Sequence, residues 1–157
     1  MEEKQVKKSI IIELDKEEYA LPVEIIGGIE RMQQITRVPK TAKFVKGVIN
    51  LRGVVTPIID LRERFGMDRI PQTDSTRIII IHQDKYNIGL IVDAAYDVID
   101  IQSEDIEPAP KVVGTVDVDY IEGVAKIGKR LVMILNLEKV LSADSYQGKI
   151  EAEEVQK

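Results

Sequence analysis

The sequence predicts an all-β fold made of two similar five-stranded barrels, and three observations support this prediction. About ten short apolar runs are separated by turn residues, few segments have helical spacing, and one long segment of the chain occurs twice. Each copy of the repeat holds about five strands. Two barrels are favoured over one sandwich because closing a small sheet removes its exposed edges.

The repeat is clearest between residues 44–61 and 120–137, which match at an offset of about 76. Gly47 corresponds to Gly123, and Asp60 corresponds to Asn136. An earlier part matches at an offset of about 67, and it pairs Tyr19, Leu21, Val23 and Glu30 with Tyr86, Ile88, Leu90 and Asp97. Matches over some fifty residues indicate an internal duplication.

Strands in the first half are predicted at residues 9–14, 19–23 and 30–38, with Pro39 ending the third. Gly27 and Gly28, set among isoleucines, predict a bulge or a tight bend. A helical turn is predicted at residues 41–45.

The segment 44–61 predicts a hairpin of two buried strands, because Val48-Ile49, Val54-Val55 and Ile58-Ile59 are apolar and mostly β-branched. Asn50-Leu51-Arg52-Gly53 is the connection, and it places Arg52 at the tip with its side chain free to reach outward. Asp60 then caps a short helical turn at residues 61–65, which ends at Gly66.

The second half predicts strands at residues 77–82, 86–92, 94–101, 120–127 and 130–135, then a short helix at 137–141. Residues 103–119 hold Pro108, Pro110 and Gly114 and predict an exposed loop. The polar segment 142–157 fits either a terminal helix or a frayed tail.

We expect residues 1–157 to form one domain with two subdomains, at about 14–76 and 77–141. The boundary is placed in the polar, Pro71-containing stretch 69–76. The strand at 9–14 and the C-terminal segment 142–157 are expected to pack on the pair.

Composition narrows the classes of function. The 157 residues are 44% hydrophobic and 31% charged, as in a folded chain, and the absence of cysteine excludes disulfides and thiol chemistry. The net charge of −5 argues against a nucleic-acid partner. No apolar run is long enough to cross a bilayer, so we expect a cytoplasmic protein that does not insert directly into the membrane.

No catalytic or metal constellation can be assembled from the sequence. His82 is the single histidine, and a lone imidazole at a strand end is more often a surface residue than a ligand. Strand alternation places Asp93 and Asp97 on one face and Asp100 on the other, which favours a solvated face over a metal site. Gly27-Gly28 lacks the lysine and the helix of a phosphate-binding loop. We therefore expect no enzyme activity and no cofactor.

Charge is distributed unevenly along the chain. Residues 31–69 contain nine Lys and Arg against three Asp and Glu, whereas residues 84–122 contain two against ten. This polarity either orients protein partners by electrostatic steering or is a chance asymmetry of solvated surfaces.

The motif Gly-Val-Ile-Asn-Leu-Arg-Gly at residues 47–53, followed by Pro-Ile-Ile-Asp-Leu at 57–61, resembles the motifs of the CheW family of bacterial chemotaxis coupling proteins. Ile-Thr-Arg-Val-Pro at 35–39 and Gly-Leu-Ile-Val-Asp at 89–93 are also similar to that family. The resemblance covers roughly residues 9–141. It implies two SH3-like barrels and a non-enzymatic adaptor that couples the cytoplasmic tips of chemoreceptors to the histidine kinase CheA.

The receptor tips that this resemblance implies are helical hairpins, and an apolar groove is the best surface to hold a helix. We predict such a groove where the barrels meet, lined by Ile25, Ile26, Ile29, Met32, Val92, Tyr96 and Val98. Arg52 matches the arginine of the family motif, which implies a role in coupling, and we predict that it also contacts the receptor. The alternative is a salt bridge to the acidic second unit.

For the kinase, the resemblance implies that a barrel of this chain pairs with the related barrel of the CheA regulatory domain. We predict that Asn50, Leu51, Gly53 and Val54 make this contact. Two other functions stay open: a fragment of a CheA-type regulatory domain, and a β-barrel that binds a small molecule. The absence of kinase, phosphotransfer and receiver segments favours the adaptor.

Overall fold

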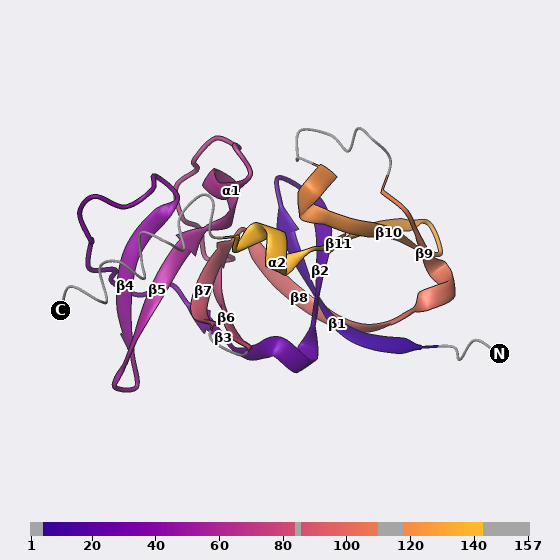
Figure 1. Cartoon of the computed structure of the whole chain (residues 1–157), viewed down its shortest axis with the longest axis horizontal. Coiled ribbons are helices and arrows are strands. Elements are labelled where there is room, and N and C mark those ends of the chain that lie inside the picture. Colours follow the sequence, from indigo (N-terminus) through magenta and orange to yellow (C-terminus); the bar gives the residue numbers. More distant parts are fainter. Residues whose placement is uncertain (1–4, 84–85, 110–117, 143–157) are drawn as a thin grey trace.

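The structure is a computed structural model, which describes residues 5–83, 86–109 and 118–142. Two small barrels lie side by side, with one short α-helix after β5 and another after β11 (Figure 1). The predicted all-β fold is confirmed. The predictions for the C-terminal segment, and for part of the 103–119 loop, concern residues outside those that the structure describes.

The first barrel is a five-stranded sheet in the order β3-β6-β7-β5-β4. A bridge between Thr36 and Val48 ties the segment that follows β3 to β4, so the two edges of this sheet approach each other. Its strands are β3 (Ile26–Arg31), β4 (Val45–Leu51), β5 (Val54–Asp60), β6 (Arg77–Gln83) and β7 (Tyr86–Val92).

The second barrel is a six-stranded sheet in the order β8-β1-β2-β11-β10-β9. It has one strand more than predicted because the two-residue β9 pairs with β10. Its strands are β1 (Val6–Leu14), β2 (Glu17–Pro22), β8 (Ala94–Gln102), β9 (Ile106–Glu107), β10 (Ile121–Ile127) and β11 (Arg130–Leu135).

Each barrel contains one hairpin from the other half of the chain. The predicted subdomains at 14–76 and 77–141 assign these hairpins to the wrong barrels. The β6–β7 hairpin follows residue 76 but pairs with β3 and β5 of the first barrel. The β1–β2 hairpin pairs with β8 and β11 of the second barrel. Hydrophobic spacing identifies a strand but does not say which sheet it joins, so the boundary at 76 and 77 does not separate the barrels.

The exchanged hairpins explain the isoleucine runs of β1 and β6, which are buried on both faces. Ile11 and Ile78 fill the second and the first barrel respectively. Their neighbours Ile10, Ile12 and Ile79 face a larger cluster that joins both barrels. The seam between the barrels is therefore the main hydrophobic core of the chain.

The internal duplication is visible as matched local structure. Asp60 caps α1 (Leu61–Arg64) by accepting a hydrogen bond from the backbone N–H of Glu63, and Asn136 caps α2 (Leu137–Val140) in the same way. Gly47 and Gly123 each lie at a β-bulge where the neighbouring backbone approaches closely. The predicted cap at Asp60 and the predicted repeat agree with this geometry.

Three local predictions are wrong. The strand predicted at residues 30–38 ends at Arg31, and only Thr36 makes a bridge beyond it. Residues 41–44 form a bend and a turn rather than a helical turn, and Val45 is already the first residue of β4. Val54 and Val55 were expected to be buried but are 48% and 59% exposed, because they begin β5 at the tip of the hairpin, beyond the barrel.

Candidate protein-interaction surfaces

The β4–β5 hairpin ends in a two-residue turn formed by Arg52 and Gly53, both with positive φ. This is the backbone that a tight hairpin requires, and glycine takes it without strain. Asn50 accepts a hydrogen bond from the backbone N–H of Gly53 at 2.8 Å, which fixes the turn.

Arg52 is held toward the first barrel rather than the second. Its guanidinium donates to a carboxylate oxygen of Glu30 on β3 at 3.3 Å, while 72% of the arginine side chain stays exposed. The predicted alternative, a salt bridge to the acidic second unit, therefore does not form. This arrangement leaves much of the guanidinium available for a partner group.

Of the residues predicted to contact the kinase, Asn50, Gly53 and Val54 are exposed at the hairpin tip, whereas Leu51 is half-buried against the first barrel's interior. Val55 extends the exposed apolar surface beside Val54. Val55 is not among the predicted contact residues, because adjacent β-branched residues are also typical of a buried strand.

The residues predicted to bind a receptor divide into three groups. Ile29 on β3 and Tyr96 and Val98 on β8 are 45%, 41% and 54% exposed, and Ile26 is half-buried. Met32 packs against the interior of the first barrel. Two others present almost no surface because they belong to the seam core: Ile25 and Val92.

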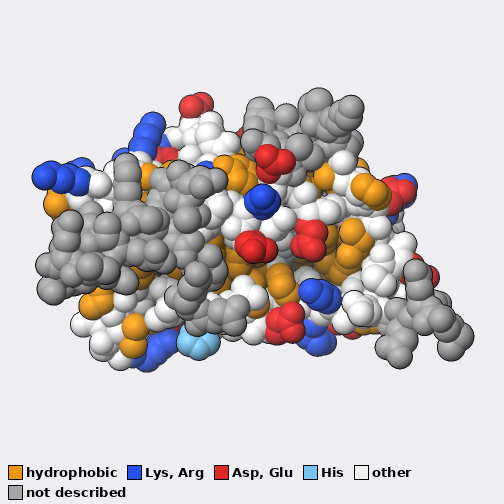
Figure 2. Space-filling view, in the orientation of Figure 1, with side chains coloured by type: hydrophobic (Ala, Val, Ile, Leu, Met, Phe, Trp, Pro, Cys, Tyr) orange, Lys and Arg blue, Asp and Glu red, His pale blue; other side chains and the backbone are white. Residues whose placement is uncertain are grey.

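A bulge at Asp97 places Tyr96 and Val98 on opposite faces of β8, although both side chains are exposed. Asp97 has a φ of 74° and interrupts the register of β8 on β1, where Tyr96 is opposite Ile11 and Val98 is opposite Ile10. The predicted alternation of aspartates along this strand is broken at the same point. Figure 2 shows charged side chains of both signs near the middle of one face, with apolar side chains reaching the surface around them.

A network of ionised groups lies beside Tyr96. Arg130 on β11 donates two hydrogen bonds to Glu18 on β2, at 2.9 and 3.0 Å, and the Tyr96 hydroxyl donates to Glu18 at 3.0 Å. The bonds from Arg130 are the main reason that the pKa of Glu18 lies below its usual value. Burial, followed by the hydrogen bond to Glu18, raises the pKa of Tyr96 to about 12.

Two arginines of α1 join the barrels, and neither is among the residues predicted to have a role. Arg64 donates to the backbone carbonyl of Val140 and stacks its guanidinium on the rings of Phe44 and Tyr120. Arg62 binds Asp93 at the crossover from β7 to β8. The only signal in the sequence is that α1 carries arginines where α2 has Glu138 and Val140.

The described residues contain no group of three or more His, Asp or Glu side chains that could hold a metal ion. His82 is exposed at the end of β6. None of the described helices has the length and hydrophobicity needed to span a membrane.

Comparison with known proteins gives one consistent family. The model of the CheW-like domain matches residues 8–145. The chain is 43% identical to the chemotaxis protein CheW of Bacillus subtilis, over 92% of both chains. It is 35% identical to the chemotaxis protein CheW of Klebsiella aerogenes, over 86% of this chain and 81% of that one.

A solved structure supports the same fold. The crystal structure of the scaffolding protein TtCheW from Thermoanaerobacter tengcongensis superimposes with a TM-score of 0.81 and 36% sequence identity. The superposition covers 89% of this chain and 95% of that structure.

Proposed function

The chain belongs to the CheW-like family, and from this premise we propose that it joins the signalling tips of chemoreceptors to the regulatory domain of a CheA-type kinase. Its role is that of a non-enzymatic chemotaxis adaptor and scaffold. In this proposal it acts in the cytoplasm and reaches membrane-bound receptor arrays through its partners.

The observation that carries the proposal is the separation of two exposed apolar surfaces on one rigid core. The first, here called the hairpin surface, consists of Val54 and Val55 with Asn50 and Gly53. The second, called the edge-strand surface, consists of Ile29 on β3 and Val98 on β8, whose strand partners Ile79 and Ile10 both face the seam cluster. Exposed apolar side chains are typical of protein-binding sites, and two such sites allow one chain to bridge two proteins.

We assign the edge-strand surface to the receptor. Strands β3 and β8 occupy equivalent places in the internal repeat, and each is an edge strand of its sheet, with Ile29 exposed on one and Val98 on the other. A helical receptor tip would lay its apolar face against these side chains. Gly27 is exposed on β3 and lacks a side chain, which permits close approach of a partner backbone.

We assign the hairpin surface to the kinase. Val54 and Val55 project at the end of a hairpin whose turn is fixed by Asn50. A partner that covers them therefore restricts little additional conformational freedom, and the entropy cost of binding is small. Arg52 lies between the two surfaces, since its guanidinium contacts Glu30, the residue after Ile29. We therefore propose that Arg52 contributes to coupling the receptor contact with the kinase contact.

The uneven distribution of charge between residues 31–69 and 84–122 is a separate part of the proposal. Several acidic groups of the second barrel are already paired locally, as Asp100 is with Lys8 and Glu107 with Lys126. The remaining polarity would steer partners, so assembly should weaken as salt concentration rises. Partner binding that does not change with salt concentration would contradict electrostatic steering but not the assignment of the two surfaces.

Co-sedimentation with a vesicle-attached receptor signalling fragment and the kinase tests the assignment. Val54→Asp should lose the kinase but keep the receptor fragment, whereas Val98→Asp should lose the receptor fragment and keep the kinase. The matched control is Leu131→Asp, because Leu131 is 62% exposed on β11 outside both surfaces. Retention of both partners by both variants would overturn the assignment.

A further inference from the structure

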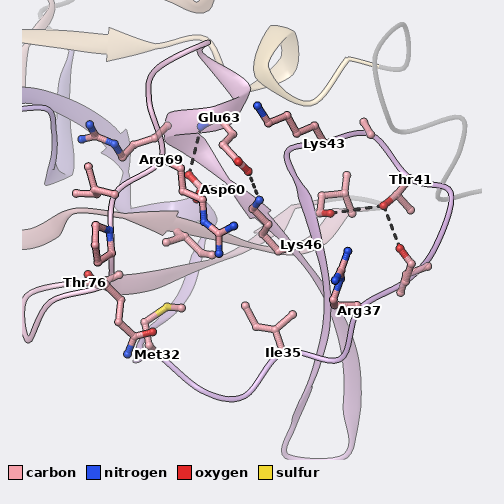
Figure 3. Close-up of a pocket in the computed structure, with 18 of the residues that line it drawn as sticks. Met32, Ile35, Arg37, Thr41, Lys43, Lys46, Asp60, Glu63, Arg69 and Thr76 are labelled. Carbon is pink, nitrogen blue, oxygen red and sulfur yellow. Dashed lines mark hydrogen bonds and ion pairs between the residues drawn. The ribbon is translucent and has the colours of Figure 1, made fainter.

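A cavity of about 960 Å³ opens at one end of the first barrel (Figure 3). One wall is the segment that leaves β3 and enters β4, from Met32 to Lys46, and another is the loop after α1, from Arg69 to Gln72. The floor includes Asp60 and Glu63. Neither docking surface described above lies in this cavity, although Met32, which was predicted to bind a receptor, lines it.

The acidic groups inside the cavity already have cationic or backbone partners. Lys46 forms an ion pair with Glu63, and Figure 3 shows the two side chains meeting inside the cavity. Arg62 forms an ion pair with Asp93, and Asp60 accepts a hydrogen bond from the backbone N–H of Glu63. The inner wall is therefore close to electrically neutral.

Four more cationic side chains surround the opening: Arg37, Lys40, Lys43 and Arg69. All four are exposed, and none of them pairs with an acidic side chain among residues 5–83, 86–109 and 118–142. Four positive charges around one opening produce a positive electrostatic potential there, and this potential attracts an anionic ligand. A basic rim above a neutral wall favours a ligand whose negative charges lie at its edges.

Apolar groups between these cations decide the class of ligand. Ile35 and Met32 are half-buried, and Ile70 is 42% exposed beside Pro71. A small inorganic anion would leave this apolar surface uncovered and would fill little of the volume. A peptide that carries both carboxylates and apolar side chains would cover both kinds of group.

We propose that this cavity binds an extended acidic peptide segment of a partner protein. Its carboxylates would lie against Arg37, Lys40, Lys43 and Arg69, and its apolar side chains against Ile35 and Ile70. The site is separate from the receptor and kinase contacts proposed above, and the inference does not depend on them.

The test is a titration of the ¹⁵N-labelled full-length chain with a ten-residue peptide in which glutamate alternates with leucine and valine. We expect amide shifts confined to residues 32–46 and 69–72, and an affinity that falls as salt rises. The same peptide with glutamine in place of glutamate should bind at least tenfold more weakly. The double variant with Arg37→Glu and Lys43→Glu should bind the acidic peptide more weakly by a similar factor.

The matched control is Lys16→Glu combined with Lys129→Glu, which changes the net charge by the same amount at two exposed hairpin turns of the second barrel. An equal loss of affinity in this control, or shifts spread over both barrels, would show general electrostatic attraction and overturn the proposal. A second full-length variant carries E151Q, E153Q and E154Q. If these changes alone shift the resonances of the cavity, the acidic occupant is the chain's own C-terminal segment and the proposal of a partner is wrong.

Discussion

Arg62 donates a hydrogen bond to Asp93 at 2.6 Å, and this pair lies where the chain passes from one barrel to the other. The arginine side chain is 10% exposed and that of the aspartate 16%. Asp93 also accepts the backbone N–H of Asp15, in the β1–β2 turn of the second barrel. One carboxylate therefore connects α1, the crossover and the exchanged hairpin.

Replacing Arg62 by methionine should lower the free energy of unfolding by about 2–4 kcal/mol, because a mostly buried carboxylate loses its cation. Urea denaturation measures this effect. The control is Lys8→Met, whose pair with Asp100 is solvent-exposed and should contribute less than about 1 kcal/mol. A change in the Arg62 variant no larger than in this control would mean that the seam does not depend on the ion pair.

Asp60→Asn tests the internal repeat, since the equivalent residue Asn136 makes the same helix cap. Burial is the main cause that raises the pKa of Asp60, so its charge at neutral pH opposes folding. The asparagine variant should keep the cap and be as stable as the native chain, or more stable, at pH 7. Asp60→Ala should lose the cap and about 1 kcal/mol.

The pH dependence of this pair of chains has a defined sign. Because the folded pKa of Asp60 is raised, the native chain should gain stability relative to Asp60→Asn as the pH falls through that value. Chemical denaturation at a series of pH values measures the difference. A difference that moves in the opposite direction would mean that the carboxylate is stabilised by its surroundings.

Arg130→Gln should act in the opposite sense through Glu18. The folded pKa of Glu18 is lowered, so its stabilising contribution is complete above the unfolded value of 4.5 and is lost as the pH falls through the folded value. At pH 7 the variant should be less stable by about 1 kcal/mol, and this difference should shrink below pH 4.5. Denaturation curves at pH 7 and pH 3 make the comparison, and a difference independent of pH would exclude Glu18 as the cause.

Gly47→Ala should destabilise the first barrel severely. Gly47 has a φ of 139°, and an added Cβ would lie 2.0 Å from the carbonyl oxygen of Thr36. Thr36 forms the bridge to Val48 that closes the barrel. We expect a loss of at least about 3 kcal/mol, seen as a large fall in melting temperature. Gly27→Ala is the control: its nearest contacts would be 3.3 Å away, and the change should stay within about 1 kcal/mol.

The parts of the fold that local chemistry determines could be predicted from the sequence. The caps at Asp60 and Asn136 need only residues three positions apart, and the repeat is visible as matched spacing. The exchange of hairpins could not be predicted, because it depends on which sheet edge a strand reaches. The signals were the unbroken isoleucine runs at residues 10–12 and 78–81, each of which indicates a strand buried on both faces.

The candidate site was predicted less completely, for reasons of geometry. The bulge at Asp97 places Tyr96 and Val98 on opposite faces of β8, although regular alternation would place them on one face, while Val92, on the preceding strand, enters the core. Strand alternation alone cannot locate a bulge. The contact of Arg52 with Glu30 also joins residues that are far apart in the sequence, and no local pattern indicates it.

The exchange of charges between Glu30 and Arg52 separates a structural role of this pair from direct recognition. Arg52→Glu alone places two carboxylates side by side, and we expect the fold to persist because the arginine is 72% exposed. It should abolish co-sedimentation with the receptor fragment and kinase. The double variant Glu30→Arg with Arg52→Glu restores the ion pair in reversed orientation, with circular dichroism as the check on folding. If Arg52 contacts a partner, the double variant should remain unable to assemble; recovery of assembly would mean that the pair acts only by holding the hairpin against β3.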